Sequence, residues 1–176
     1  MKKFGEPSAF QIECIHEPIP NSRGHVYGRM CLRFESDILG DLDEPACMLN
    51  VTAARLKDVL NELGGLEVQD LFALTDSALW ARLDTVLYRD DNRTAVEVAA
   101  DARRYSRFDF LTNGGESFDK SKSFIVMNQR HVRILFDDAQ RPLVGKTVDR
   151  HVFVEALRSF VEWVETEGAR MKAEIQ

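Results

Sequence analysis

The sequence has few cysteines and no long apolar run, and both shortages limit the kind of protein it encodes. It holds 3 cysteines among 176 residues, without a C-x-x-C pair. An odd count at wide spacing is typical of reduced thiols rather than of a disulfide framework. No stretch approaches the ~18 apolar residues of a transmembrane helix, and "MKKFGEPSAF" has no apolar core like that of a signal peptide. We therefore expect a cytoplasmic protein with no membrane partner.

Sequence motifs of the common enzyme classes are also missing. There is no G-x-S-x-G nucleophile elbow and no G-x-G-x-x-G loop, and "GKT" at 145–147 lacks the upstream glycine of a phosphate-binding loop. The 4 histidines form neither H-x-x-x-H nor H-E-x-x-H, the helical pairs of many zinc sites. We therefore expect no enzyme activity, metal or cofactor. A small hydrolase-like enzyme with a scattered active site, using His25 or His131 beside a carboxylate, stays open as the alternative.

Basic residues are outnumbered by acidic ones. There are 23 Lys and Arg against 29 Asp and Glu, which gives a net charge of −6 and a pI near 5.3. Nucleic acid is a poor partner for such a surface, because phosphate binding needs clustered Lys and Arg. A basic protein is the better partner, since opposite potentials speed encounter. The same charge also serves to keep a small domain in solution.

The chain does contain enough apolar material for a core. Apolar residues make up 44 % of it, including 11 Phe and 2 Trp. A chain of this size buries roughly 70 % of the surface that its unfolded form exposes. Charged residues of both signs are interspersed along it, which does not favour disorder. We expect one domain over residues 1–176.

Apolar periodicity predicts both strands and helices. Period-two alternation indicates strands, in the segments 8–16, 25–36, 38–39 and 122–138, the last as two strands joined near 128–130. Helical spacing indicates helices at 50–65, 75–88, 94–104 and from 149 onward. Residues 105–119 are expected to be a strand entering an Asn-Gly-Gly turn, and 138–145 a loop. This order predicts an α+β fold, an antiparallel sheet with helices packed mainly on one face.

The strand pattern also separates two of the cysteines. Cys14 shares the apolar face of its strand with Phe10 and Ile12, whereas Cys31 points away from the apolar face of the next strand. If both apolar faces meet one core, the two thiols lie on opposite faces of the sheet. A disulfide between them is therefore not expected.

An acidic stretch follows the second predicted strand and carries Asp37, Asp41, Asp43 and Glu44. It does not match a calcium-binding loop beginning at Asp41, because Ala46 stands where that loop needs glycine and Thr52 where it needs glutamate. Mg²⁺ is rarely held by two carboxylates without phosphate or further ligands. A solvated loop, or a surface for a basic partner, is the better interpretation.

Several segments carry a family resemblance. "FGEPSAFQIECI", with Phe4, Gly5, Pro7, Phe10 and Ile12, resembles the opening of the immunity protein 42 family of bacterial polymorphic-toxin systems. "YGRMCLRFESDILGD", "RFDFLTNGGESFDKSKSFIV" and "FVEALRSFVEW" are similar to later parts of that family. The resemblance implies a cytosolic antidote that binds a cognate toxin domain and blocks it by stoichiometric inhibition. It supplies no functional residues, since none of these motifs is catalytic.

The interface must then be predicted from physical chemistry. Toxins that act on nucleic acid are basic, so the acidic stretch can occupy a phosphate-binding groove and speed association. Tyr27 is a candidate aromatic anchor, and Trp163 is another because it lies off the apolar stripe of the last helix. The predicted partner-binding residues are Asp37, Asp41, Asp43, Glu44, Tyr27 and Trp163, with Asp90 and Asp91 as a second acidic patch. The protein is expected to act as a monomer or homodimer.

Overall fold

Two antiparallel sheets carry the fold, in a computed structural model that describes residues 1–19, 21–89, 92–138 and 141–173. The first sheet has the order β1-β2-β3-β4, and β5 pairs with β3. Its strands are β1 (Lys2–Glu6), β2 (Phe10–Glu17), β3 (Tyr27–Phe34), β4 (Asp37–Leu39) and β5 (Cys47–Met48). The second sheet has the order β6-β7-β8, with β6 (Ser121–Met127), β7 (His131–Asp138) and β8 (Arg141–Asp149). The predicted α+β class is confirmed, with the strands divided between two sheets.

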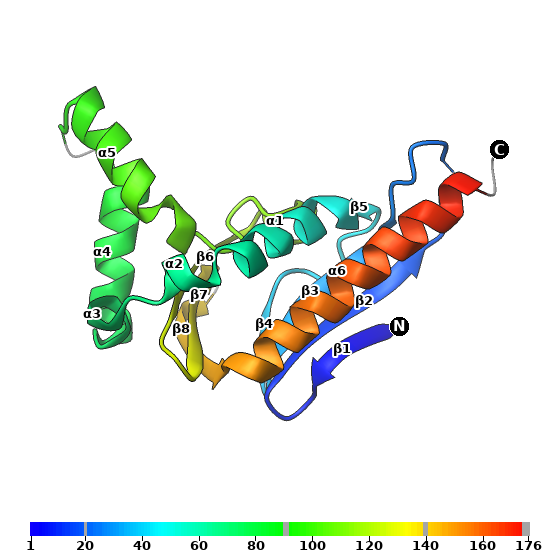
Figure 1. The fold of residues 1–176 in the computed structure, drawn as a ribbon, viewed down its shortest axis with the longest axis horizontal. Helices are drawn as coiled ribbons and strands as arrows, with labels where there is room; N and C mark the ends of the chain where they lie inside the picture. The colour runs from blue at the N-terminus through cyan, green and yellow to red at the C-terminus, as the bar shows by residue number, and fades with distance from the viewer. Residues whose placement is uncertain (20, 90–91, 139–140, 174–176) are drawn as a thin grey trace.

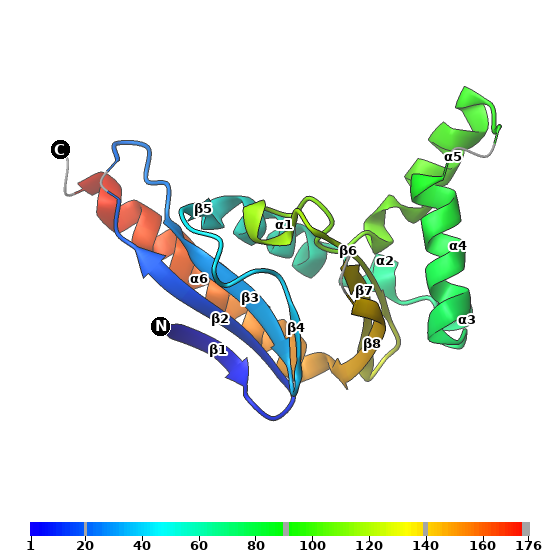
Figure 2. The same cartoon turned by 180° about the vertical axis from the view of Figure 1, so that it is seen from behind.

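A long helix covers one face of the first sheet. Helix α6 (Arg150–Ala173) lies along β1, β2 and β3, and helix α1 (Leu49–Asn61) lies beside it (Figures 1 and 2). Phe153, Leu157 and Phe160 are all fully buried, because their spacing places them on one side of α6. The helix thus buries its apolar side on the sheet, as the sequence pattern predicts.

Aromatic side chains join the two sheets into one core. Phe10 and Phe34 of the first sheet have ring centroids 5.2 Å apart, and Phe34 stacks on Phe136 of the second sheet at 5.7 Å. Phe153 of α6 reaches Phe10 at 5.0 Å. Offset and tilted aromatic pairs at these distances contribute about 0.5–1.5 kcal/mol each beyond their burial. The core is therefore continuous from the first sheet through α6 to the second.

Two helices project from the second sheet as an antiparallel pair, α4 (Asp76–Tyr88) and α5 (Ala95–Tyr105), which we call the arm (Figure 1). The short helices α2 (Leu63–Leu66) and α3 (Gln69–Phe72) connect α1 to it. Thr75 caps α4, since its hydroxyl accepts a hydrogen bond from the N–H of Ala78. Thr94 and Glu97 form a capping box at the start of α5, which confirms the helix predicted for 94–104.

The arm is held to the second sheet through a buried carboxylate. Asp84 of α4 is only 6 % exposed. It lies 2.5 Å from Nζ of Lys122 on β6 and 2.8 Å from Nε of Arg89. Burial acts to raise the pKa of Asp84, but hydrogen bonds from Lys122 and Arg89 outweigh it and hold the pKa below its ordinary value. Trp80 packs edge-on against Phe124 of β6 at 4.9 Å and adds an apolar contact to the same junction.

Two local predictions are wrong. Residues 105–119 form no hairpin but two 3₁₀ turns, η1 (Ser106–Phe108) and η2 (Glu116–Phe118). The chain between these turns is hydrogen-bonded to Ser123 of β6. The Ser123 hydroxyl accepts a hydrogen bond from the N–H of Leu111, and the Ser123 carbonyl accepts one from the N–H of Phe110. Most of the predicted loop 138–145 belongs to β8, which pairs with β7.

The cysteine prediction is confirmed. Cys14 pairs across the sheet with Met30, and Cys31 pairs with Glu13, so the two thiols lie on opposite faces. Cys14, Cys31 and Cys47 are all free and buried. Burial raises the pKa of Cys14 to about 12 and that of Cys31 to about 11, which disfavours the reactive thiolate at both.

Candidate partner-binding surfaces

The segment 37–44, which we call the acidic segment, has a fixed backbone. Gly40 has a φ of +99°, and a Cβ atom at this position would come within 2.8 Å of the Phe118 ring. The N–H of Asp41 donates a hydrogen bond of 2.8 Å to the carbonyl of Ser117. The turn after β4 therefore depends on glycine, and it rests on the segment around η2.

Two of the four predicted carboxylates, Asp41 and Glu44, lie beside one lysine. Nζ of Lys120 lies 3.2 Å from Asp41 and 3.7 Å from Glu44. The backbone N–H of Asp43 donates to the Asp41 carboxylate at 2.9 Å. This backbone hydrogen bond, together with Lys120, lowers the pKa of Asp41 from its ordinary value. The side chain of Asp43 itself is exposed.

Asp37 is placed apart from the other three. Its carboxylate lies 2.7 Å from Nζ of Lys146 on β8, where it ties the first sheet to the second. The structure thus brings together Asp41, Asp43 and Glu44 and assigns Asp37 a partner within the molecule. The second predicted patch, Asp90 and Asp91, lies outside the described residues.

The two predicted aromatic anchors are both partly buried. Tyr27 lies on β3, with its hydroxyl 3.5 Å from Nδ1 of His25. The Trp163 ring packs between β1 and α6, 5.7 Å from the Phe4 ring and 6.1 Å from that of Phe160, and Lys2 lies over it. Much of the Trp163 surface is therefore used inside the molecule.

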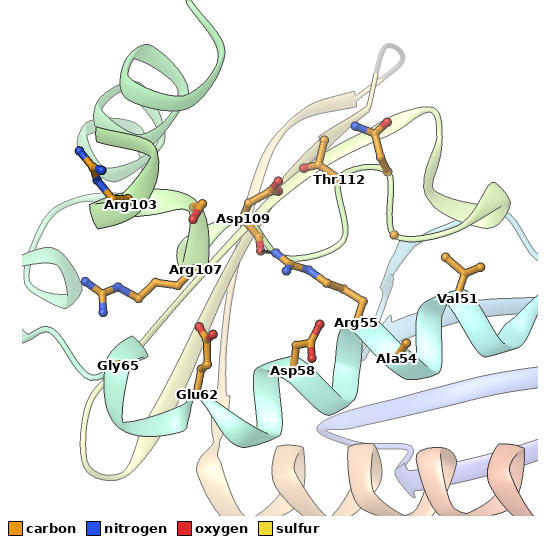
Figure 3. Close-up of a pocket in the computed structure, with 13 residues that line it drawn as sticks. Val51, Ala54, Arg55, Asp58, Glu62, Gly65, Arg103, Arg107, Asp109 and Thr112 are labelled. Atoms are coloured by element: carbon orange, nitrogen blue, oxygen red, sulfur yellow. Dashed lines mark hydrogen bonds between the residues drawn. The ribbon is translucent and has the colours of Figure 1, made fainter. Parts of the chain in front are cut away.

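A groove lies between α1 and the segment formed by α5 and η1 (Figure 3). Its volume is about 770 Å³. We call it the charged groove, because its walls carry Asp58, Glu62, Arg103 and Arg107. Its remaining lining includes Val51, Ala54, Arg55, Gly65, Asp109, Thr112 and Gly114.

The two walls of the charged groove have opposite signs. Asp58 and Glu62 project from α1 into the hollow, and Arg107 extends from η1 over Gly65 (Figure 3). Arg103 lines the same groove from α5, with its guanidinium turned away from α1 (Figure 3). All four side chains belong to exposed residues. Within the described ranges, no ion pair joins one wall to the other. Opposite charges thus face a common hollow without neutralising each other.

Arg55 and Asp109 fix the back of the groove. Nε of Arg55 donates 3.0 Å to the carbonyl of Phe110, and its guanidinium also donates to the carbonyl of Asp109. One oxygen of the Asp109 carboxylate accepts from the Tyr88 hydroxyl at 2.7 Å. The other oxygen is buried without a hydrogen bond to any described residue. Arg55 therefore serves the fold. Arg107 also has internal contacts, since its Nε donates 3.2 Å to the carbonyl of Arg104 and its guanidinium lies over the Phe108 ring. Asp58 and Glu62 on the other wall remain exposed.

The sequence contained a signal for this groove. Asp58 and Glu62 are four residues apart, and so are Arg103 and Arg107. On α1, like charges at this spacing repel each other and do not stabilise the helix. Arg103, in contrast, lies in the last turn of α5, where a cation interacts favourably with the helix dipole, and Arg107 lies beyond that helix in η1. Only the acidic pair is therefore a signal of charge that its helix does not need. What no pattern indicated is that the two pairs, over 40 positions apart in the chain, face one another.

The family comparison decides the kind of protein. The family model described as immunity protein 42 matches residues 1–163. The chain belongs to the immunity protein 42 family. The resemblance seen in the sequence is thereby confirmed, and it extends over the fold from β1 into α6. Members of such families are typically inhibitors rather than enzymes.

A solved structure supports the same fold for this immunity protein 42 member. The crystal structure of CdiI from Burkholderia dolosa AUO158 matches with a TM-score of 0.66 and 13 % sequence identity, covering 92 % of this chain and 99 % of that one. At this identity the likeness concerns the fold alone. None of the curated proteins matches the chain.

Among the described residues of this immunity protein 42 member, neither histidine of the enzyme alternative is hydrogen-bonded to a carboxylate side chain. His131 is exposed at the start of β7, opposite Asp149 of β8, and the Asp149 carboxylate is engaged by the N–H groups of His151 and Val152 at the start of α6. His25 contacts Tyr27 rather than a carboxylate. In the part of the chain that the structure describes, no three His, Cys, Asp or Glu side chains are grouped to hold a metal ion. In the same part, no helix is both long and apolar enough to cross a membrane.

Proposed function

We propose that this protein is the antidote to a bacterial toxin domain, which it binds in the cytosol and neutralises by stoichiometric protein–protein inhibition. The observation that carries the proposal is the family match over residues 1–163. Inhibition by binding needs neither a cofactor nor a catalytic residue. The whole chain would act as one domain, since its core is continuous across both sheets.

Co-expression tests this proposal directly. The C-terminal domain of the protein encoded beside this chain would be expressed in a bacterial host with and without the chain, and surviving colonies counted. We expect the neighbour to kill alone and the chain to restore growth. A harmless neighbour, or one that still kills in the presence of the chain, would contradict the proposal.

We further propose that the acidic segment contributes to the toxin interface. Asp41, Asp43 and Glu44 gather on one turn, and Asp43 is exposed there. Lys120 offsets part of this charge, so the turn acts mainly on the rate of encounter with a basic toxin. Asp37, Tyr27 and Trp163 would flank this contact, although their side chains also serve internal packing and pairing.

Charge reversal tests the acidic segment. The variant Asp41→Lys/Asp43→Lys should associate with the toxin domain roughly tenfold more slowly than the wild type at low salt, and the difference should shrink as salt is added. Glu6→Lys/Glu162→Lys is the matched control, because both residues are exposed on other elements and the change in net charge is the same. Equal association rates for the two variants would remove the acidic segment from the interface.

A further inference from the structure

The charged groove differs from the rest of the surface in how its charges are used. Elsewhere, exposed carboxylates and cations commonly meet within the molecule, as Lys57 and Glu165 do at 2.6 Å. In the groove, Asp58 and Glu62 face a hollow whose far wall is basic (Figure 3). A fold that needed only solubility would not require a concave surface with separated signs.

We infer that the charged groove receives a segment of the toxin domain that places a basic side chain against Asp58 and Glu62 and an acidic side chain against Arg103 and Arg107. The inference rests on the proposed function and names a second part of the same interface. Its basis is charge complementarity: only an occupant with both signs, in this orientation, satisfies both walls. A uniformly basic segment would be attracted to α1 and repelled by the opposite wall.

The lining favours a polypeptide segment over a small molecule. Small-molecule sites are mostly apolar with a few polar groups, whereas 6 of the 13 residues that line this groove are charged. Ala54, Gly65 and Gly114 are small, and they leave room for another backbone to approach. Arg107 lies over Gly65, with its nearest guanidinium nitrogen 3.3 Å from the position of a Cβ atom there. This long side chain can therefore move to meet an occupant.

The groove is also continuous with the acidic segment through one stretch of chain. Thr112, Asn113 and Gly114 line the groove. Three residues later, the carbonyl of Ser117 accepts the hydrogen bond from Asp41 that fixes the acidic segment. A single partner lying along this stretch would reach both regions. The acidic segment would then speed encounter, while the groove would fix the orientation of the bound toxin domain.

Two wall variants test the inference. Asp58→Lys/Glu62→Lys reverses the α1 wall, and Arg103→Glu/Arg107→Glu reverses the other. The probe is the C-terminal domain of the protein encoded beside this chain, and its dissociation constant would be measured by calorimetry or surface plasmon resonance. We expect each variant to bind at least roughly tenfold more weakly than the wild type, mainly through faster dissociation. Circular dichroism and thermal melting would establish that both variants fold.

Matched controls separate the groove from a general effect of net charge. Glu6→Lys/Glu162→Lys reproduces the charge change of the first variant, and Arg23→Glu/Arg130→Glu that of the second, on exposed residues outside the groove. Both controls should bind within about twofold of the wild type. Wall variants that bind as tightly as their controls would overturn the inference.

Two other outcomes distinguish its failure from that of the proposed function. If the wild type does not bind the toxin domain at all, the proposed function fails, and the inference fails with it. If the wild type binds and only the wall variants lose a self-association seen before toxin is added, the groove belongs to a second copy of this chain. That result would overturn the inference and leave the proposed function standing.

Discussion

The acidic segment and the charged groove show two ways of arranging surface charge. In the acidic segment, Asp41 and Glu44 share Lys120, and Asp37 is paired with Lys146. In the groove, charges of both signs stand apart across a hollow. The number of carboxylates in a sequence segment therefore does not give the charge that the segment presents to a partner. Lysines from distant parts of the chain can form ion pairs with these carboxylates in the fold. The sequence does not show that the two walls of the groove face each other, but in the structure their charged residues are exposed.

The largest expected difference between the two regions concerns their glycines. Gly40→Ala should destabilise the protein by about 2–4 kcal/mol, because φ is +99° and the new Cβ would strike Phe118. Gly65→Ala should change stability by less than about 1 kcal/mol, since its neighbour is the movable end of Arg107. Urea unfolding of both variants measures the difference. Equal midpoints would show that the acidic segment is not held as described.

Two lysines of neighbouring position serve different regions. Lys122→Ala should cost about 2 kcal/mol, because it removes one of two cations from the buried carboxylate of Asp84. Lys120→Ala should leave the unfolding midpoint almost unchanged, because its ion pairs are exposed to solvent. Thermal melts would compare the two. A larger loss for Lys120 would place the stronger anchor at the acidic segment rather than at the arm.

Loss of stability in acid should also be larger at the arm junction, through Asp84, than at the acidic segment, through Asp41. The pKa values of Asp84 and Asp41 are both held below their ordinary value of 3.8. Each carboxylate therefore contributes stability that is complete above about pH 4 and is lost as the pH falls through its lowered pKa. Asp84→Asn should flatten the fall in stability below about pH 4 more than Asp41→Asn does, since Asp84 is the more buried. Unfolding measured across this range would contradict the ranking if Asp41→Asn had the larger effect.

The smallest effect is expected at the acidic wall of the groove. Glu62 stands at the C-terminal end of α1, where a cation interacts favourably with the helix dipole. Glu62→Lys should therefore stabilise the protein by a few tenths of a kcal/mol while weakening toxin binding. Denaturation and binding would be measured on the same sample. A marked loss of stability would show that Glu62 stabilises the fold. Weaker binding of the variant would then be no evidence of a contact between Glu62 and the toxin domain.

The sequence by itself determined the elements whose signals are local. Thr75 and Thr94 cap helices because the hydroxyl and the first N–H groups are neighbours in the chain. The faces of Cys14 and Cys31 follow from strand alternation, and the family resemblance follows from short motifs. These features do not depend on which distant segment the chain meets.

Tertiary structure decided everything that depends on distant partners. Ser123 accepts hydrogen bonds from the backbone N–H groups of residues 110–111, and 3₁₀ turns form where a hairpin was expected. Pairing with β7 makes a strand of residues that were expected to form a loop. Lys120 and Lys146 form ion pairs with the acidic segment. Residues of α1 and α5 together line the charged groove. Such contacts arise from packing of the whole core, whereas periodicity reports only the immediate neighbours of each residue.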